Sequence, residues 1–154
     1  MHRFSVLLAF SCWLALSVPA QAATGRVLKV LPHFLDAEGR NARAPSLYDR
    51  DAYQYFLREN PEKRSAIRFD VHWKAKGPFN DQLKLRVEAR GIAQGNLPKQ
   101  FVLERPVEPS GWFSHWSGLS LSGDDYKQFG EITAWRVTLW ENAQLIGEQK
   151  SFLW

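Results

Sequence analysis

Cysteine is almost absent from this chain, because Cys12 is the only one among 154 residues. It lies in the apolar N-terminal stretch, so the rest of the chain can form neither a disulfide nor a thiolate nucleophile. Metal-ligand spacings such as H-E-x-x-H are also missing, and His33, His72 and His115 are far apart in the sequence. The sequence therefore predicts no metal and no other cofactor.

Motifs of the common enzyme classes are missing as well. The chain contains no Walker A loop and no dinucleotide-binding glycine pattern, and its serines do not stand in a G-x-S-x-G elbow. Asp124 and Asp125 precede a short helical stretch, where acidic side chains cap backbone N–H groups. A catalytic hypothesis would have to rest on Asp124, Asp125 or His115. We therefore predict a protein that is not an enzyme.

Long apolar runs are scarce, and the one that exists begins at the N-terminus. A basic start at Met1–Arg3 precedes an apolar stretch from Phe4 to Val18, and Ala20-Gln21-Ala22 supplies the small residues that signal peptidase requires. The stretch is shorter than the ~20 residues of a membrane-spanning helix. It also continues past Cys12, which argues against a lipoprotein. We predict that residues 1–22 are a cleaved signal peptide, which leaves no stable transmembrane segment.

Cleavage would leave residues 23–154, a length that suits one domain with its own core. Loss of Arg3 would lower the formal net charge from +4 to +3, and the cations are scattered rather than gathered in one tract. Export without disulfides is typical of the bacterial envelope, so we expect a periplasmic or extracellular protein. A mildly basic protein there can meet anionic surfaces, whereas nucleic acid is not an expected partner.

The first part of the mature chain combines a strand with an inserted loop and helix. Residues 26–35 are rich in β-branched residues and leucine, and Pro32 favours an edge strand or a bulge. Ser46 and Asp49 form a capping box that predicts a helix up to Glu59. Within this insertion at 37–65, we expect an aromatic helix face to pack against a sheet. The residues of that face are Tyr48, Ala52, Tyr55, Phe56 and Glu59.

From Ala66 onward, apolar and polar residues alternate with a period of two, which is typical of strands with one buried face. The first run covers 66–76 and the second covers 83–90, with Gly77-Pro78-Phe79-Asn80-Asp81 between them. We interpret the two runs as an antiparallel hairpin, the main hairpin of the fold.

Further short strands are expected at 101–103, 112–121, 131–141 and 145–154, with a bulge at Ser117–Gly118. A helical turn at 122–130 ends in glycine. About seven strands predict a mainly β domain, an antiparallel two-sheet sandwich with one helix inserted before the main hairpin. In strand pattern, residues 66–154 resemble immunoglobulin-like or fibronectin-III-like modules. Tyr126 is then a candidate tyrosine corner, although the cysteine pair of true immunoglobulin domains is missing.

Tryptophan is unusually frequent, with six of the seven residues beyond the signal peptide. Trp73 and Trp135 have the parity of buried strand residues. A candidate binding surface consists of Trp112, His115, Trp116 and Trp140. Exposed tryptophan serves as an anchor in protein interfaces, so we predict a protein partner in the envelope.

Three alternatives stay open for the tryptophans and the C-terminus. The protein could be a carbohydrate-binding module, in which exposed Trp rings stack on a glycan. Trp112 and Trp116 could instead only cover an open end of a sheet. The aromatic C-terminus is also compatible with a small outer-membrane β-barrel, but Glu148 and Lys150 share the parity of Trp154 and would then face lipid.

Overall fold

The computed structural model describes residues 24–77, 82–93, 96–108 and 113–154, and the predicted signal peptide and Trp112 lie outside these ranges. The described chain is mainly β. Its strands are β1 (Thr24–Leu35), β2 (Ala66–Lys76), β3 (Leu83–Ala93), β4 (Leu97–Val107), β5 (His115–Ser122), β6 (Glu131–Glu141) and β7 (Gln144–Lys150). Its helices are α1 (Leu47–Glu59), α2 (Gly123–Phe129) and the single 3-10 turn η1 (Pro61–Lys63).

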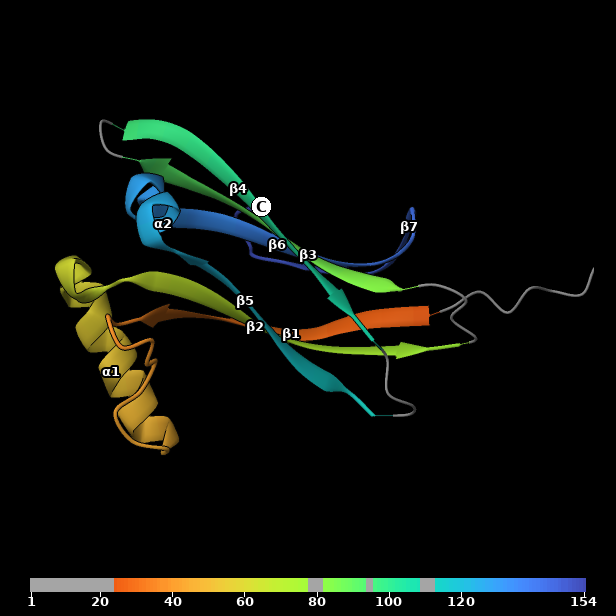
Figure 1. Ribbon diagram of the computed structural model, residues 1–154, viewed down its shortest axis with the longest axis horizontal. Coiled ribbons are helices and arrows are strands. Elements are labelled where there is room, and N and C mark those ends of the chain that lie inside the picture. Colours follow the sequence, from red (N-terminus) through yellow and green to blue (C-terminus); the bar gives the residue numbers. More distant parts are fainter. Residues whose placement is uncertain (1–23, 78–81, 94–95, 109–112) are drawn as a thin grey trace, which may run out of the picture.

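The strands form two antiparallel sheets. One sheet has the order β1-β2-β5 and the other β4-β3-β6-β7, and we refer to them as sheet A and sheet B. Figure 1 shows the two sheets as layers, with both helices at one end. The opposite end contains the start of β1, the end of β2 and the turn between β6 and β7. Among the described residues, no helix is long and apolar enough to cross a membrane.

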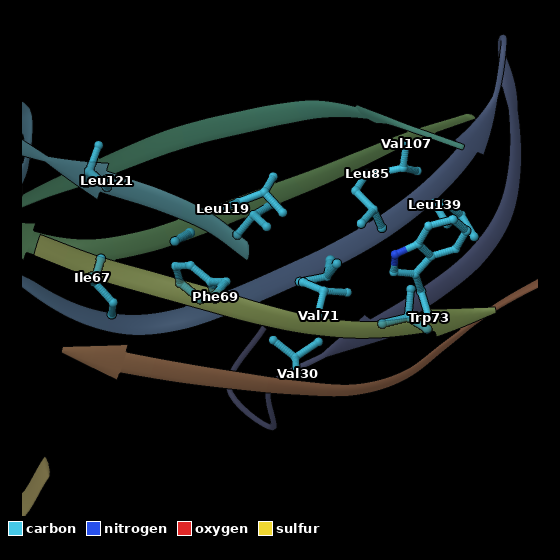
Figure 2. Packing of buried hydrophobic residues seen from close by; sticks show 14 of the residues in the cluster. Val30, Ile67, Phe69, Val71, Trp73, Leu85, Val107, Leu119, Leu121 and Leu139 are labelled. Atoms are coloured by element: carbon cyan, nitrogen blue, oxygen red, sulfur yellow. The ribbon is translucent and has the colours of Figure 1, made fainter. Parts of the chain in front are cut away.

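Alternating side chains from both sheets meet in one core, as the period-two pattern predicts. Phe69, Val71 and Trp73 of β2 are completely or almost completely buried, and Figure 2 shows them opposite Leu85 and Leu139 of sheet B. Burial of each such side chain contributes about 1.5–3 kcal/mol. The inward parity of β2, β3 and β6 is therefore confirmed.

The predicted hairpin between the second and third strands is wrong. β2 pairs with β1 and β5 in sheet A, whereas β3 pairs with β4 and β6 in sheet B. The chain between them crosses from one sheet to the other. Both arrangements bury one face of each strand, so the alternation alone cannot distinguish a hairpin from a crossing. The helix consequently precedes a strand of sheet A and not a hairpin.

β5 also differs from its prediction, because its pairing with β2 continues without a register shift from Ala66–Ser122 to Trp73–His115. No bulge interrupts it at Ser117–Gly118. The pattern breaks there because Ser117 faces the core, where its hydroxyl accepts a hydrogen bond from the Trp73 indole at 3.0 Å. The following helical turn is confirmed as α2, with Gly130 at φ 83° as its C-cap.

Helix α1 has the predicted limits but buries a different face. Ser46 is the N-cap, and its hydroxyl accepts a hydrogen bond from the Asp49 N–H at 3.0 Å. The buried residues are Tyr53, Gln54 and Leu57, while Tyr48 and Tyr55 are exposed. The expected aromatic face therefore does not cover a sheet. The helix is held by the complete burial of Leu57 and by polar contacts at the end of β1.

Asp36 is the centre of those polar contacts. Its carboxylate accepts hydrogen bonds from the Tyr53 hydroxyl at 2.6 Å and from Arg40 Nε at 2.8 Å. The backbone N–H groups of Glu38 and Arg40 donate to it as well. Burial raises the pKa of Asp36, but the hydrogen bonds from Tyr53 and Arg40 outweigh it and lower the pKa to about 2.

Candidate functional site: the outer face of sheet A

The three described residues of the predicted binding surface, His115, Trp116 and Trp140, do not share one face. Trp116 lies on β5 and points away from the core, whereas His115 has inward parity and its ring lies 5.4 Å from that of Trp73. Trp140 lies on the outer face of sheet B, where its indole N–H donates to Thr138 at 2.8 Å. Trp112 lies outside the described residues. Of the three described residues, Trp116 alone lies on the outer face of sheet A.

Trp116 is 54% exposed and belongs to a small polar and aromatic cluster. Its ring stacks on that of His72, with 4.7 Å between centroids and 7° between planes. Nε2 of His72 lies 2.8 Å from the Ser114 hydroxyl, which orients the imidazole. The stacking fixes the orientation of the indole against His72, while more than half of Trp116 stays accessible.

Cations lie beside this cluster in rows that cross the sheet. Lys29 of β1 is paired in register with His72, which in turn is paired with Trp116. Arg26 is paired with Lys74 in the same manner. Directly opposed residues of antiparallel strands have Cβ atoms only about 4.5–5.5 Å apart. The outer face of sheet A therefore brings together charges that are scattered in the sequence.

The strands of sheet A contain only one acidic residue among their described positions, Asp70 of β2. Asp70 is engaged by His33 Nδ1 at 2.9 Å and by Arg68 Nε at 2.8 Å. Burial raises the pKa of Asp70, but the hydrogen bonds from His33 and Arg68 outweigh it and lower this pKa. The carboxylate of Asp70 is consequently already paired with His33 and Arg68, toward the helix end of the sheet. Within the described part of the chain, no carboxylate pairs with Arg26, Lys29 or Lys74.

The outer face of sheet B differs, because most of its cations have partners among the described residues. Arg136 lies 2.6 Å from Glu88 and Lys84 lies 3.1 Å from Glu104. The guanidinium groups of Arg90 and Arg136 also lie over the Trp154 ring, at 4.0 and 5.2 Å from its centroid. Most cations of this face are therefore partnered, whereas Arg26, Lys29 and Lys74 of sheet A have no carboxylate partner among the described residues.

A groove of about 730 Å³ opens at the helix-free end of sheet A. Arg26, Lys74 and Lys76 supply its charge, and Leu28 and Leu145 supply exposed apolar surface. The remaining lining residues are Thr24, Gly25, Ser114, Gln144 and Ile146. None of the described lining residues is acidic, so the groove suits an anionic ligand with some apolar surface.

The residues named for a metal site or for a catalytic hypothesis are not brought together by the part of the chain that the structure describes. No group of three or more His, Cys, Asp or Glu side chains in these ranges is placed to hold a metal ion. Asp124 and Asp125 lie in the first turn of α2, and Asp124 lies 3.7 Å from Lys127. His115 begins β5 and α2 follows its other end, roughly 23 Å away at 3.3 Å per residue.

Arg26, Lys29 and Lys74 were not singled out by sequence reasoning, because no two of them are adjacent in the chain. A signal was nevertheless present, since 24–35, 66–76 and 115–122 contain a single acidic residue. The scarcity of acidic residues becomes informative only because these three segments form one sheet.

Comparison with known protein families, curated proteins and solved structures found no match to this chain.

Proposed function

We propose that this protein is an exported, non-enzymatic binding module that binds a protein partner, in the bacterial envelope or outside the cell, through the outer face of sheet A. The observation that carries the proposal is the set of uncompensated cations, Arg26, Lys29 and Lys74, beside the exposed ring of Trp116. Tryptophan and arginine are enriched among the residues that dominate binding energy in protein interfaces. On the outer face of sheet B, most cations instead pair with carboxylates or lie over the Trp154 ring.

Export forms part of the proposal and rests on residues 1–22. A basic start, an apolar segment and an A-x-A site are the parts that signal peptidase recognises. The mature chain would then begin near Ala23, directly before β1. Partners in that compartment are envelope or extracellular molecules.

We also propose that residues 23–154 form a single domain of the immunoglobulin-like and fibronectin-III-like class. A constant-type immunoglobulin sandwich has the first, second, fifth and fourth strands in one sheet and the third, sixth and seventh in the other. The present order differs only in β4, which pairs with β3 instead of β5. Tyr126 lies between the fifth and sixth strands, as a tyrosine corner would, but its hydroxyl interacts with Arg64.

Site-specific photocrosslinking in intact cells tests the proposal. A photoreactive phenylalanine analogue replaces Leu28, which is 43% exposed on sheet A, or Val102, which is 49% exposed on sheet B. We expect a discrete protein adduct from position 28 and none from position 102. The adduct should disappear in the double variant Lys29→Glu and Lys74→Glu, with its fold checked by circular dichroism.

Absence of any adduct at position 28, or an adduct at position 102 alone, would contradict the proposal. An adduct at position 28 that survives the double charge reversal would also contradict it, because the cations would then contribute nothing.

A glycan is the second candidate partner, and the observation that favours it is the flat, half-exposed ring of Trp116 stacked on His72. Sugar rings stack on such aromatic faces. Titration with a panel of neutral and acidic oligosaccharides should then change tryptophan fluorescence, and Trp116→Ala should abolish the change. An unchanged spectrum across the panel removes this candidate.

A further inference from the structure

We propose that the groove at the helix-free end of sheet A is the docking site of an acidic, partly apolar segment of the protein partner. This inference rests on the proposed function and specifies the chemistry of what is bound. It depends on three features of the groove: its charge, its apolar edge and its shape.

The charge of the groove is concentrated by strand register. Arg26 of β1 stands directly opposite Lys74 of β2, so two like charges face each other across the ladder. Directly opposed like charges destabilise a sheet. An anion bound between them would remove that repulsion and gain attraction from both. Lys76 extends the cationic lining toward the end of β2.

The apolar edge of the groove is created by an irregularity in β1. The register between β1 and β2 shifts between Val27 and Lys29, which leaves Leu28 as the extra residue of a bulge. Leu28 is thereby turned outward beside Arg26. Leu145, at 45% exposed, lines the groove from β7. The site therefore presents cations and leucine side chains together.

The shape and lining favour a peptide segment over a membrane or a glycan. A concave groove of about 730 Å³ accepts a ligand of limited cross-section, whereas an anionic bilayer needs a flat or convex cationic surface. Among the described residues, the lining contains no aromatic ring on which a sugar could stack. An extended acidic segment with alternating apolar residues satisfies both the cations and the leucines.

The test uses the mature chain, residues 23–154, and a fluorescein-labelled heptapeptide of alternating Glu and Leu. A heptapeptide of alternating Gln and Leu has nearly the same shape without the charge. Fluorescence anisotropy at about 50 mM and 300 mM salt should give binding of the Glu/Leu peptide only, weaker at the higher salt. Equal affinity for the two peptides would overturn the inference.

Substitutions then locate the bound peptide. Arg26→Gln and Lys74→Gln should each weaken binding about fivefold, as expected for loss of one ion pair. Lys74→Arg should retain it. Lys150→Gln is the matched control, because Lys150 is an exposed cation on β7 that does not line the groove. An equal loss in Lys150→Gln and Lys74→Gln would place the peptide elsewhere and overturn the inference.

Two further probes separate this inference from the proposed function. Vesicles of anionic phosphatidylglycerol and a sulfated oligosaccharide are tested against the same variants. Binding of either one that depends on Arg26 and Lys74, without peptide binding, overturns the inference. A photoadduct from position 28 without peptide binding leaves the proposed function standing and overturns the inference alone. Peptide binding without a photoadduct supports the groove and counts against an envelope protein partner.

Discussion

The side-chain amide of Gln54 pairs with the peptide group of Phe34. Its oxygen accepts a hydrogen bond from the Phe34 N–H at 2.8 Å, and its nitrogen donates to the Phe34 carbonyl at 2.9 Å. A side chain of α1 thereby takes the place of a neighbouring strand at the free edge of β1. Pro32, two residues earlier on the same edge, has no N–H to offer. Helix α1 thus protects an edge that could otherwise pair with another chain.

Replacement of Gln54 should therefore weaken the fold substantially. Gln54 is buried and also donates to the Asn41 carbonyl at 2.9 Å, so Gln54→Ala removes three hydrogen bonds. We expect the free energy of unfolding to fall by about 2–3 kcal/mol, measured by urea denaturation. Gln128→Ala, at an exposed position of α2, is the matched control and should change it by less than about 0.5 kcal/mol. Equal effects of the two substitutions would argue against the edge-capping role.

Stability should depend on pH through Asp36. Its pKa is lowered from 3.8 to about 2 in the folded protein, so its contribution is complete above about pH 4. That contribution is lost as the pH falls from about 4 to about 2. Asp36→Asn should therefore show a smaller loss of stability across this window than the wild-type protein. Unfolding free energies measured at several pH values test this, with Asp51→Asn, at an exposed position of α1, expected to keep the wild-type slope.

Loss of the hydrogen bond between Trp73 and Ser117 should lower the free energy of unfolding more than loss of an exposed serine hydroxyl of β5. Ser117→Ala leaves the buried indole N–H without its partner, which costs about 1–2 kcal/mol of unfolding free energy. Ser120→Ala, on the outer face of the same strand, should be nearly neutral. Thermal and urea unfolding of the two variants provide the comparison. A neutral Ser117→Ala would mean that the indole finds another acceptor.

Alanine substitution at two glycines with positive φ should lower the free energy of unfolding by different amounts. A Cβ at Gly130 would lie 2.1 Å from the Ile92 carbonyl oxygen, a backbone atom, in addition to the strain at φ 83°. We expect Gly130→Ala to lower the unfolding free energy by more than about 3 kcal/mol. Gly39→Ala, at φ 75° with no atom within 4 Å, should cost only about 1 kcal/mol. Similar losses would show that the clash at Gly130 is relieved by movement.

Local patterns by themselves determined where the strands lie and which face of several strands is buried. Their limits were less certain, because β4 extends over Leu97–Val107 where 101–103 was expected, and β7 ends at Lys150 where 154 was expected. Ile67, Phe69 and Val71 alternate with polar residues, and burying the apolar ones removes them from water whatever strand lies alongside. The start of α1 at Ser46 and the end of α2 at Gly130 were predictable for a similar reason. A cap or a left-handed glycine is decided by a few neighbouring backbone groups.

Tertiary structure alone decided which strands are partners and which surface carries the site. A hairpin and a crossing between sheets bury the same alternating residues, so β2 and β3 could not be assigned to different sheets from their pattern. The buried face of α1 includes the polar Gln54, because its side-chain amide pairs with the open edge of β1. Arg26, Lys29 and Lys74 became neighbours only through the register of β1 and β2, which separate segments of the chain form on folding.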